Sequence, residues 1–203
     1  MNPVFRLLMW LPALCLSGLT LAQEAPRIVE GQAFARSVSV AGSELQLNGT
    51  GVRGVAWFKG FAAALYLSRG STTTRQVLAA SGAKRLQLRM LHDVPAAEFV
   101  KALKKGAERN TPAAEWPSLQ PSLQRFGEQI GALGKVRKGD RIDLDLDPAR
   151  GLVFSVNGTL RGEPLPGDAL FNALLRAFLG EHPYDDELKA GLLAGAGRNG
   201  PTD

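Results

Sequence analysis

The sequence is poor in the side chains that most often carry covalent or metal-dependent chemistry. It contains one cysteine, Cys15, and two histidines, His92 and His182. Cys15 lies in a segment that we expect to be removed, so the mature chain has no disulfide, no thiolate nucleophile and no cysteine-ligated metal site. Neither histidine has a second potential ligand at the spacing of a zinc site, and no serine stands in a G-x-S-x-G elbow. The sequence therefore predicts no metal site and no cofactor.

The first 22 residues have the pattern of a secretory signal peptide. Arg6 supplies a positive charge, an apolar run extends from Leu7 to Leu21, and Ala22 offers a small residue for cleavage. The run is shorter than the roughly 20 apolar residues of a membrane-spanning helix, so we expect no stable membrane insertion after cleavage. Because Leu14 and not a small residue precedes Cys15, lipid attachment is not expected. A chain exported in this way is predicted to be periplasmic.

The remainder of the chain predicts a single domain by its length of about 180 residues. We expect residues 23–35 to form a loose leader, residues 36–195 the folded domain, and residues 196–203 a disordered tail. The densest basic cluster, Lys101, Lys104 and Lys105, has no aromatic residues between its members. It indicates a solvated helix face, and no nucleic-acid partner is predicted.

The hydrophobic pattern predicts an α+β fold, in which helices cover one face of an antiparallel sheet. Alternation of apolar and polar residues indicates strands over 84–92 and, strictly kept, over 141–147. An Asn-Gly turn after residue 156 indicates a hairpin. Helices are expected over 74–81, from Pro95, over 118–133, from Asp168 to Gly180, and over 185–193.

The stretch from Leu47 to Phe58 has the strongest local signal. Asn48-Gly49 stands between two apolar runs, which predicts a hairpin turn. Arg53 follows as a fixed cation at the start of a strand that is almost free of charge. Two alternatives follow: Arg53 pairs with a carboxylate of this chain, or it binds the acidic group of a ligand.

The same stretch, Gly49 to Gly54, matches G-x-G-x-x-G, the dinucleotide-binding fingerprint. That motif requires a helix that opens at the glycines and an acidic residue about 20 positions later. Here a strand-like segment from Val52 to Phe58 follows, and no acidic residue stands at that distance. We therefore interpret the glycines as turn and bulge residues.

Asp143, Asp145 and Asp147 begin like a calcium-binding EF-hand loop. That loop requires glycine at its sixth position and glutamate at its twelfth, where this sequence has Pro148 and Phe154. The carboxylates alternate with apolar residues, so we expect a strand with an acidic solvent face and no calcium site.

Several motifs, in their order and spacing, together resemble the exported bacterial branch of the chalcone isomerase-like family. The resemblance covers roughly residues 35 to 195. It is carried by Asn48-Gly49-x-Gly51-x-Arg53, Ala64-Leu65-Tyr66-Leu67, Gly139-Asp140, Gly151 to Gly158, and Phe178-Leu179-Gly180-x-x-Pro183-x-Asp185 with Leu188-Lys189 and Leu192-Leu193. It implies an open-faced β-sandwich: a curved antiparallel sheet with a helical layer on one face and a cleft between them. It also implies two kinds of relative, plant enzymes that cyclise chalcones and non-catalytic proteins that bind fatty acids.

The resemblance assigns Arg53 to the arginine that holds a substrate oxyanion in the enzymes and a carboxylate in the fatty-acid binders. The enzymes' hydroxyl positions fall near Phe61 and at about Ala177, neither of which has a hydroxyl. No tyrosine stands in the strand from Lys84 to His92, where the plant enzymes carry one. Trp57 and Tyr66 complete the predicted ligand-binding set, as cleft wall and as a hydroxyl near the cleft.

We therefore predict a non-catalytic protein that binds a small amphipathic carboxylate, such as a fatty acid. One alternative is an isomerase, an intramolecular lyase acting on a phenolic or enone substrate, in which Arg53 stabilises an enolate or phenolate. Another is a structural or partner-binding periplasmic protein. An acid or base within hydrogen-bond reach of Arg53 would favour the isomerase, and a carboxylate of the chain paired with Arg53 would favour the structural protein.

Overall fold

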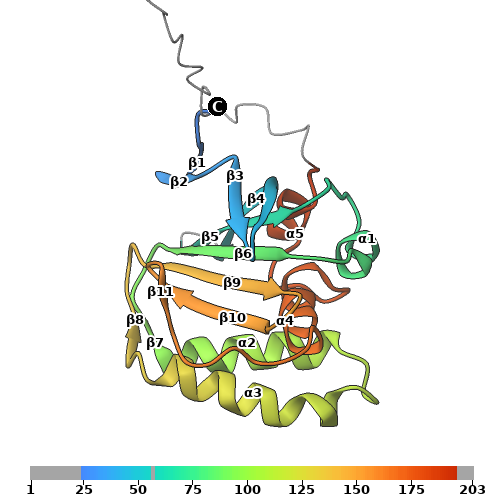
Figure 1. Ribbon diagram of the computed structural model, residues 1–203. Helices are drawn as coiled ribbons and strands as arrows, with labels where there is room; N and C mark the ends of the chain where they lie inside the picture. The colour runs from blue at the N-terminus through green and yellow to red at the C-terminus, as the bar shows by residue number, and fades with distance from the viewer. Residues whose placement is uncertain (1–23, 56–57, 196–203) are drawn as a thin grey trace, which may run out of the picture.

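The computed structural model describes residues 24–55 and 58–195. The predicted signal peptide, the predicted tail and Trp57 lie outside these residues. A curved antiparallel sheet of seven strands forms the centre of the molecule (Figure 1). From one edge to the other its strands are β11 (Thr159–Leu160), β10 (Gly151–Val156), β9 (Arg141–Asp147), β6 (Lys84–Met90), β5 (Phe58–Leu67), β4 (Ser43–Val55) and β3 (Ser37–Val40).

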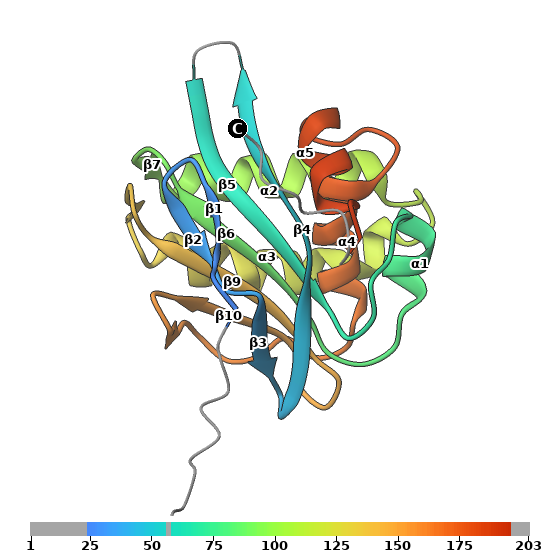
Figure 2. The same ribbon diagram turned by 90° about the horizontal axis from the view of Figure 1, so that it is seen from above.

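Helices cover one face of this sheet (Figures 1 and 2). They are α2 (Ala96–Asn110), α3 (Trp116–Gly131), α4 (Ala169–Leu179) and the short α5 (Asp186–Leu192), while α1 (Thr74–Ala79) lies at the sheet's end. Alternate residues of β6, such as Leu86 and Leu88, bury their side chains in the main core, which also takes in most of the residues of the apolar helix α4. The predicted α+β class, a curved antiparallel sheet with a helical layer on one face, is confirmed. None of the described helices is both long and apolar enough to cross a membrane.

A smaller second core lies on the opposite face of the sheet. Two short strands, β1 (Arg27–Val29) and β2 (Gln32–Phe34), pair with each other there (Figure 2). The side chain of Phe34 is fully buried in this core, beside Leu45, Ala64 and Tyr66. The expectation of a loose leader over residues 23–35 is therefore wrong, because Phe34 anchors a hairpin to the sheet.

The carboxylates of β9 do not form the solvent face that their alternation predicts. Asp145 accepts two hydrogen bonds from Arg85 of β6, both at 2.6 Å. Asp143 accepts one from Gln87 at 2.7 Å and is only 2 % exposed. Burial raises the pKa of Asp145, and the hydrogen bond and charge of Arg85 offset part of that rise. This face is thus a layer of cross-strand polar pairs, which alternation within a single strand cannot reveal.

The predicted turn at Asn48-Gly49 is also wrong, because both residues lie inside the continuous strand β4. The side-chain amide of Asn48 is fully buried and donates to the carbonyls of Ser71 (2.9 Å) and Leu192 (2.7 Å). Its oxygen accepts from the backbone N–H of Ser71. The register of β4 and β5 shifts between Leu47 and Gly49, which confirms the predicted bulge. The second Asn-Gly pair, Asn157-Gly158, does form the turn between β10 and β11.

Candidate functional site

Arg53 lies on the face of the sheet that the helices cover. Gly49, Gly51 and Arg53 are alternate residues of β4, paired with Leu65, Ala63 and Phe61 of β5. A β-carbon at Gly49 would lie 2.7 Å from the carbonyl oxygen of Leu192, so the backbone of α5 rests directly on this part of the strand. The lack of side chains at the glycines therefore allows α5 to pack directly on the strand. Arg53 is the next helix-facing position along β4.

A cavity of about 240 Å³ opens beside Arg53. It is formed by the end of the β4–β5 pair, the end of β6 and the first half of α2. Apart from Arg53 and Glu98, its wall is apolar or glycine: Gly60, Phe61, Met90, Val94, Phe99 and Ala102. We call it the Arg53 cavity. A single cation at an apolar wall suits an anionic group attached to an apolar body.

Within the part of the chain that the structure describes, the guanidinium of Arg53 makes a single hydrogen bond. Its Nη1 donates to the carbonyl of Gly54 at 3.0 Å. Within residues 24–55 and 58–195, no carboxylate lies within 4.0 Å of it. Glu98 lines the same cavity but is paired with Lys101, at 3.9 Å. Because a guanidinium has five N–H donors, Arg53 can still hold a carboxylate by two parallel bonds.

Tyr184 supports the cavity from behind, a role that the sequence did not reveal. Its hydroxyl donates to the carbonyl of Ala102 at 2.7 Å, and its ring packs against Gly106. The ring also contacts Phe178 edge-on, with centroids 5.1 Å apart, and Phe178 in turn contacts Phe61 at 6.0 Å. Burial raises the pKa of Tyr184, so its phenol stays neutral and hydrogen-bonded at neutral pH. The sequence feature that could have indicated this role is the aromatic residue Tyr184 directly after His182-Pro183.

The structure brings together only part of the predicted site. Phe61 joins Arg53 in the cavity wall. Tyr66 lies on the opposite face of the sheet, fully buried, and its hydroxyl has no hydrogen-bond partner. Burial raises the pKa of this phenol too. Ala177 is buried in the main core on α4, where its carbonyl accepts from the N–H of Tyr184. Tyr66 therefore does not place its hydroxyl near the cleft, and Ala177 is not among the described residues that line the Arg53 cavity.

The Arg53 cavity offers binding groups but few groups for acid–base catalysis. Of the lining residues that the structure describes, Glu98 is the only titratable one other than Arg53, and its side chain is 64 % exposed. Among the described residues, no three His, Cys, Asp or Glu side chains are grouped so that they could hold a metal ion. The arrangement can hold and orient an anion. The buried phenol nearest to it, Tyr184, interacts electrostatically with Arg53 but donates its hydrogen bond to the carbonyl of Ala102 and does not line the described cavity wall.

Comparison with known proteins gives two findings. A family model described as chalcone isomerase-like matches residues 26–194. The fold is similar to the crystal structure of an Arabidopsis thaliana fatty-acid binding protein, with a TM-score of 0.60 at 15 % sequence identity, over 80 % of this chain and 92 % of that one. No curated protein matches by sequence.

Proposed function

This chain belongs to the chalcone isomerase-like family, and we propose that it binds a small amphipathic carboxylate, such as a fatty acid, without transforming it. The observation that carries the proposal is Arg53, half-buried at an apolar cavity, with no carboxylate partner in the described part of the chain. A guanidinium in that setting is suited to a carboxylate, which it can grip by a bidentate pair of hydrogen bonds.

The size of the cavity limits how much of the ligand lies inside it. At about 240 Å³ it is smaller than pockets that enclose drug-sized ligands, which measure roughly 300–1,000 Å³. It suits a short acyl chain, or the carboxylate end of a longer chain whose tail continues outside. Phe61, Met90 and Phe99 would supply the apolar contact, worth roughly 25 cal/mol per Å² removed from water.

The two alternatives receive less support. An isomerase needs an acid or base positioned at the reacting atoms, and the one carboxylate of the cavity, Glu98, is exposed and paired with Lys101. A purely structural role for Arg53 would be expected to come with an ion pair, which the described residues do not provide. Export to the periplasm is part of the proposal and is supported by the signal-like pattern of residues 1–22.

The test is titration calorimetry of the mature protein with dodecanoate, beside the Arg53→Gln and Arg161→Gln variants. Arg161 is an exposed arginine that follows β11 at the opposite edge of the sheet, so the control removes the same charge elsewhere. We expect Arg53→Gln to weaken binding by about tenfold or more, since hydrogen bonds to a charged group contribute about 1.5–3 kcal/mol. Arg161→Gln should leave the affinity unchanged.

Urea unfolding of the same variants separates binding from folding. We expect Arg53→Gln to change the free energy of unfolding by less than about 1 kcal/mol, as for a residue without an ion-pair partner. Unchanged affinity in Arg53→Gln would refute the proposal. A second combination of results would also refute it: the unaltered protein does not bind dodecanoate, and Arg53→Gln lowers the free energy of unfolding by more than about 3 kcal/mol. A loss of that size is the effect of breaking a buried ion pair.

A further inference from the structure

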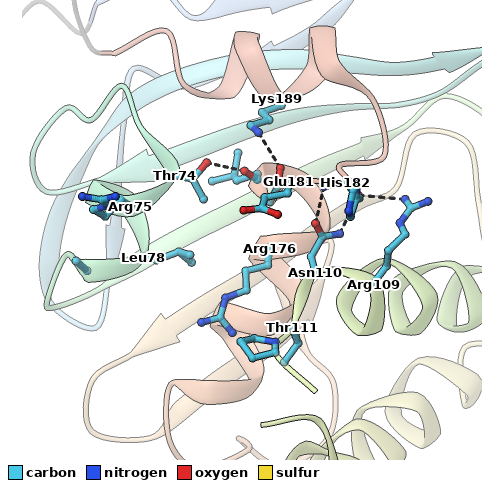
Figure 3. Close-up of a pocket in the computed structure, with 14 residues that line it drawn as sticks. Thr74, Arg75, Leu78, Arg109, Asn110, Thr111, Arg176, Glu181, His182 and Lys189 are labelled. Carbon is cyan, nitrogen blue, oxygen red and sulfur yellow. Dashed lines mark hydrogen bonds between the residues drawn. The ribbon is translucent and has the colours of Figure 1, made fainter. Parts of the chain in front are cut away.

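A second and larger cavity lies at the other end of the helical layer, away from Arg53. Its volume is about 730 Å³, within the usual range for small-molecule sites. It is enclosed by α1, by the C-terminal ends of α2 and α4, and by Lys189 of α5 (Figure 3). We call it the helix-end pocket. None of its lining residues belongs to the Arg53 cavity.

Four cations line the helix-end pocket, each from a different helix: Arg75 of α1, Arg109 of α2, Arg176 of α4 and Lys189 of α5. Glu181 is the one acidic residue among the lining residues. Convergence of several cations on one cavity produces a local positive potential that attracts anions. Leu78, Leu179 and Pro112 add apolar wall.

The helix C-termini alone would repel an anion, because their free carbonyls carry partial negative charge. Here the last carbonyl of α4 and two carbonyls of the loop that follows it are engaged by side chains, as the dashed lines of Figure 3 show. Thr74 donates to the carbonyl of Leu179 at 2.5 Å and Lys189 to that of Gly180 at 2.7 Å. Asn110 and Arg109 both donate to the carbonyl of His182, at 2.8 and 3.1 Å. These three acceptors are thus covered, and the side chains of Lys189 and Arg109, which cover two of them, have further N–H donors.

Two charged side chains of the pocket lack an ion-pair partner. Within residues 24–55 and 58–195, neither Arg75 nor Glu181 has an oppositely charged group within 4.0 Å, although both line the same cavity. Arg176 makes one contact, to Glu115 at 3.1 Å. The hydroxyl oxygen of Thr111, at the wall, is buried without a hydrogen-bond partner, a costly arrangement that a bound polar group or water would relieve.

We propose that the helix-end pocket binds a phosphate monoester that carries an apolar body. The phosphate dianion would lie between Arg75 and Arg176, whose planar guanidinium groups match phosphate geometry. The apolar body would rest on Leu78, Leu179 and Pro112. The carboxylate of Glu181 would repel the phosphate and so lower the affinity. This site does not depend on the carboxylate-binding function proposed for the Arg53 cavity.

The experiment is titration calorimetry of the whole mature protein with phenyl phosphate, and with inorganic phosphate as the comparison. We expect phenyl phosphate to bind more tightly than inorganic phosphate, because only the former uses the apolar wall. Arg75→Gln should weaken phenyl phosphate binding by about tenfold, from the loss of charge-assisted hydrogen bonds. Arg75 is exposed, so this variant should fold normally, which a melting curve checks.

Three further variants sharpen the result. Glu181→Gln should strengthen phenyl phosphate binding several-fold, since it removes a like charge from the pocket. Arg53→Gln and Arg161→Gln should leave it unchanged. The proposal is overturned if phenyl phosphate does not bind at about 10 mM, a concentration that would saturate even a 1 mM complex. Equal binding of inorganic phosphate, or equal binding by Arg75→Gln, would also overturn it.

A final arm separates a soluble ligand from a lipid headgroup. Vesicles that contain phosphatidic acid present the same phosphate monoester at a membrane surface. Binding to such vesicles that depends on Arg75, without binding of soluble phenyl phosphate, would overturn the small-molecule assignment. Competition between phenyl phosphate and the vesicles at the same site would support it.

Discussion

Arg53 of β4 and Phe61 of β5 are register partners across two long antiparallel strands, and both face the helices. Directly opposed residues of an antiparallel pair hold their side chains close together on one face. The cation and the aromatic ring therefore enter the same cavity wall as a unit. Their spacing is set by strand pairing and not by a loop, so the site is preorganised before any ligand arrives.

Replacing Tyr66 by phenylalanine tests which face of the sheet carries the site. The Tyr66 hydroxyl is buried without a partner, on the face away from Arg53. A buried unsatisfied hydroxyl costs about 1–3 kcal/mol, so we expect Tyr66→Phe to be as stable as the unaltered protein or more stable, by up to about 1 kcal/mol. Dodecanoate affinity should not change. A calorimetric titration showing a tenfold loss would place the hydroxyl in the binding machinery after all.

The contact between α5 and β4 can be tested with alanine at Gly49. A β-carbon there would lie 2.7 Å from the carbonyl oxygen of Leu192 and closer still to that of Gly191. Backbone cannot move aside as a flexible side chain can, so we expect Gly49→Ala to lower the free energy of unfolding by about 2 kcal/mol or more in urea titrations. The matched control is Gly131→Ala, at the end of α3, where a β-carbon would meet nothing within 4 Å. That variant should be neutral or slightly stabilising.

The carboxylate of Asp147 is expected to make the stability of the protein depend on pH in acid. It accepts hydrogen bonds from Nε of Arg150 (2.6 Å) and from the N–H of Ala149 (2.9 Å), and these two contacts lower the pKa of its carboxyl. A carboxyl with a lowered pKa in the folded protein contributes stability above its unfolded pKa, near 4. That contribution is lost as the pH falls through the lower folded value.

The Asp147→Asn variant should therefore be less stable than the unaltered protein at pH 7 and should lose less stability on acidification. Melting temperatures measured from pH 7 down to pH 2 would show the two curves approaching each other in acid. Parallel curves over that whole range would mean that the ionised form of Asp147 contributes nothing to stability.

Regular elements with a clear period were predictable from the sequence. Alternation predicted β6 and β9, and the broad apolar stripe predicted α4, because in each case one element's own side chains determine its buried face. The second Asn-Gly pair was predicted correctly because the contacts of Asn157 with Asp140 and Arg141 leave the local turn in place.

The failures have a common physical cause, which is a partner distant in sequence. Asn48-Gly49 lies within a strand because Ser71 and Leu192 satisfy the Asn48 side chain and α5 occupies the space over Gly49. Asp143 and Asp145 are buried because Gln87 and Arg85 stand opposite them. Local sequence propensities carry no information about contacts between residues that are distant in the sequence.

The alternation of β5 separates two residues of the predicted site. Phe61 and Tyr66 belong to the same strand and are separated by an odd number of positions. Successive side chains of a strand point to opposite faces, so these two could not both reach one cleft. Arg53 is predictable because it is a single arginine in a strand of few charges. The helix-end pocket is not, because its cations come from four separate helices.

The hydrogen bond between Asn48 and Leu192 joins residues that are 144 positions apart. Because the two residues are so far apart in the sequence, forming this contact requires closing a very long loop. The entropy cost of that closure must be overcome before the contact stabilises the fold. One of the first long strands to leave the ribosome therefore keeps its glycine-lined surface uncovered until one of the last helices has been made. We expect α5 to dock late and slowly, with the rest of the sheet already formed. Until then that uncovered surface is the part of the chain most exposed to misassociation.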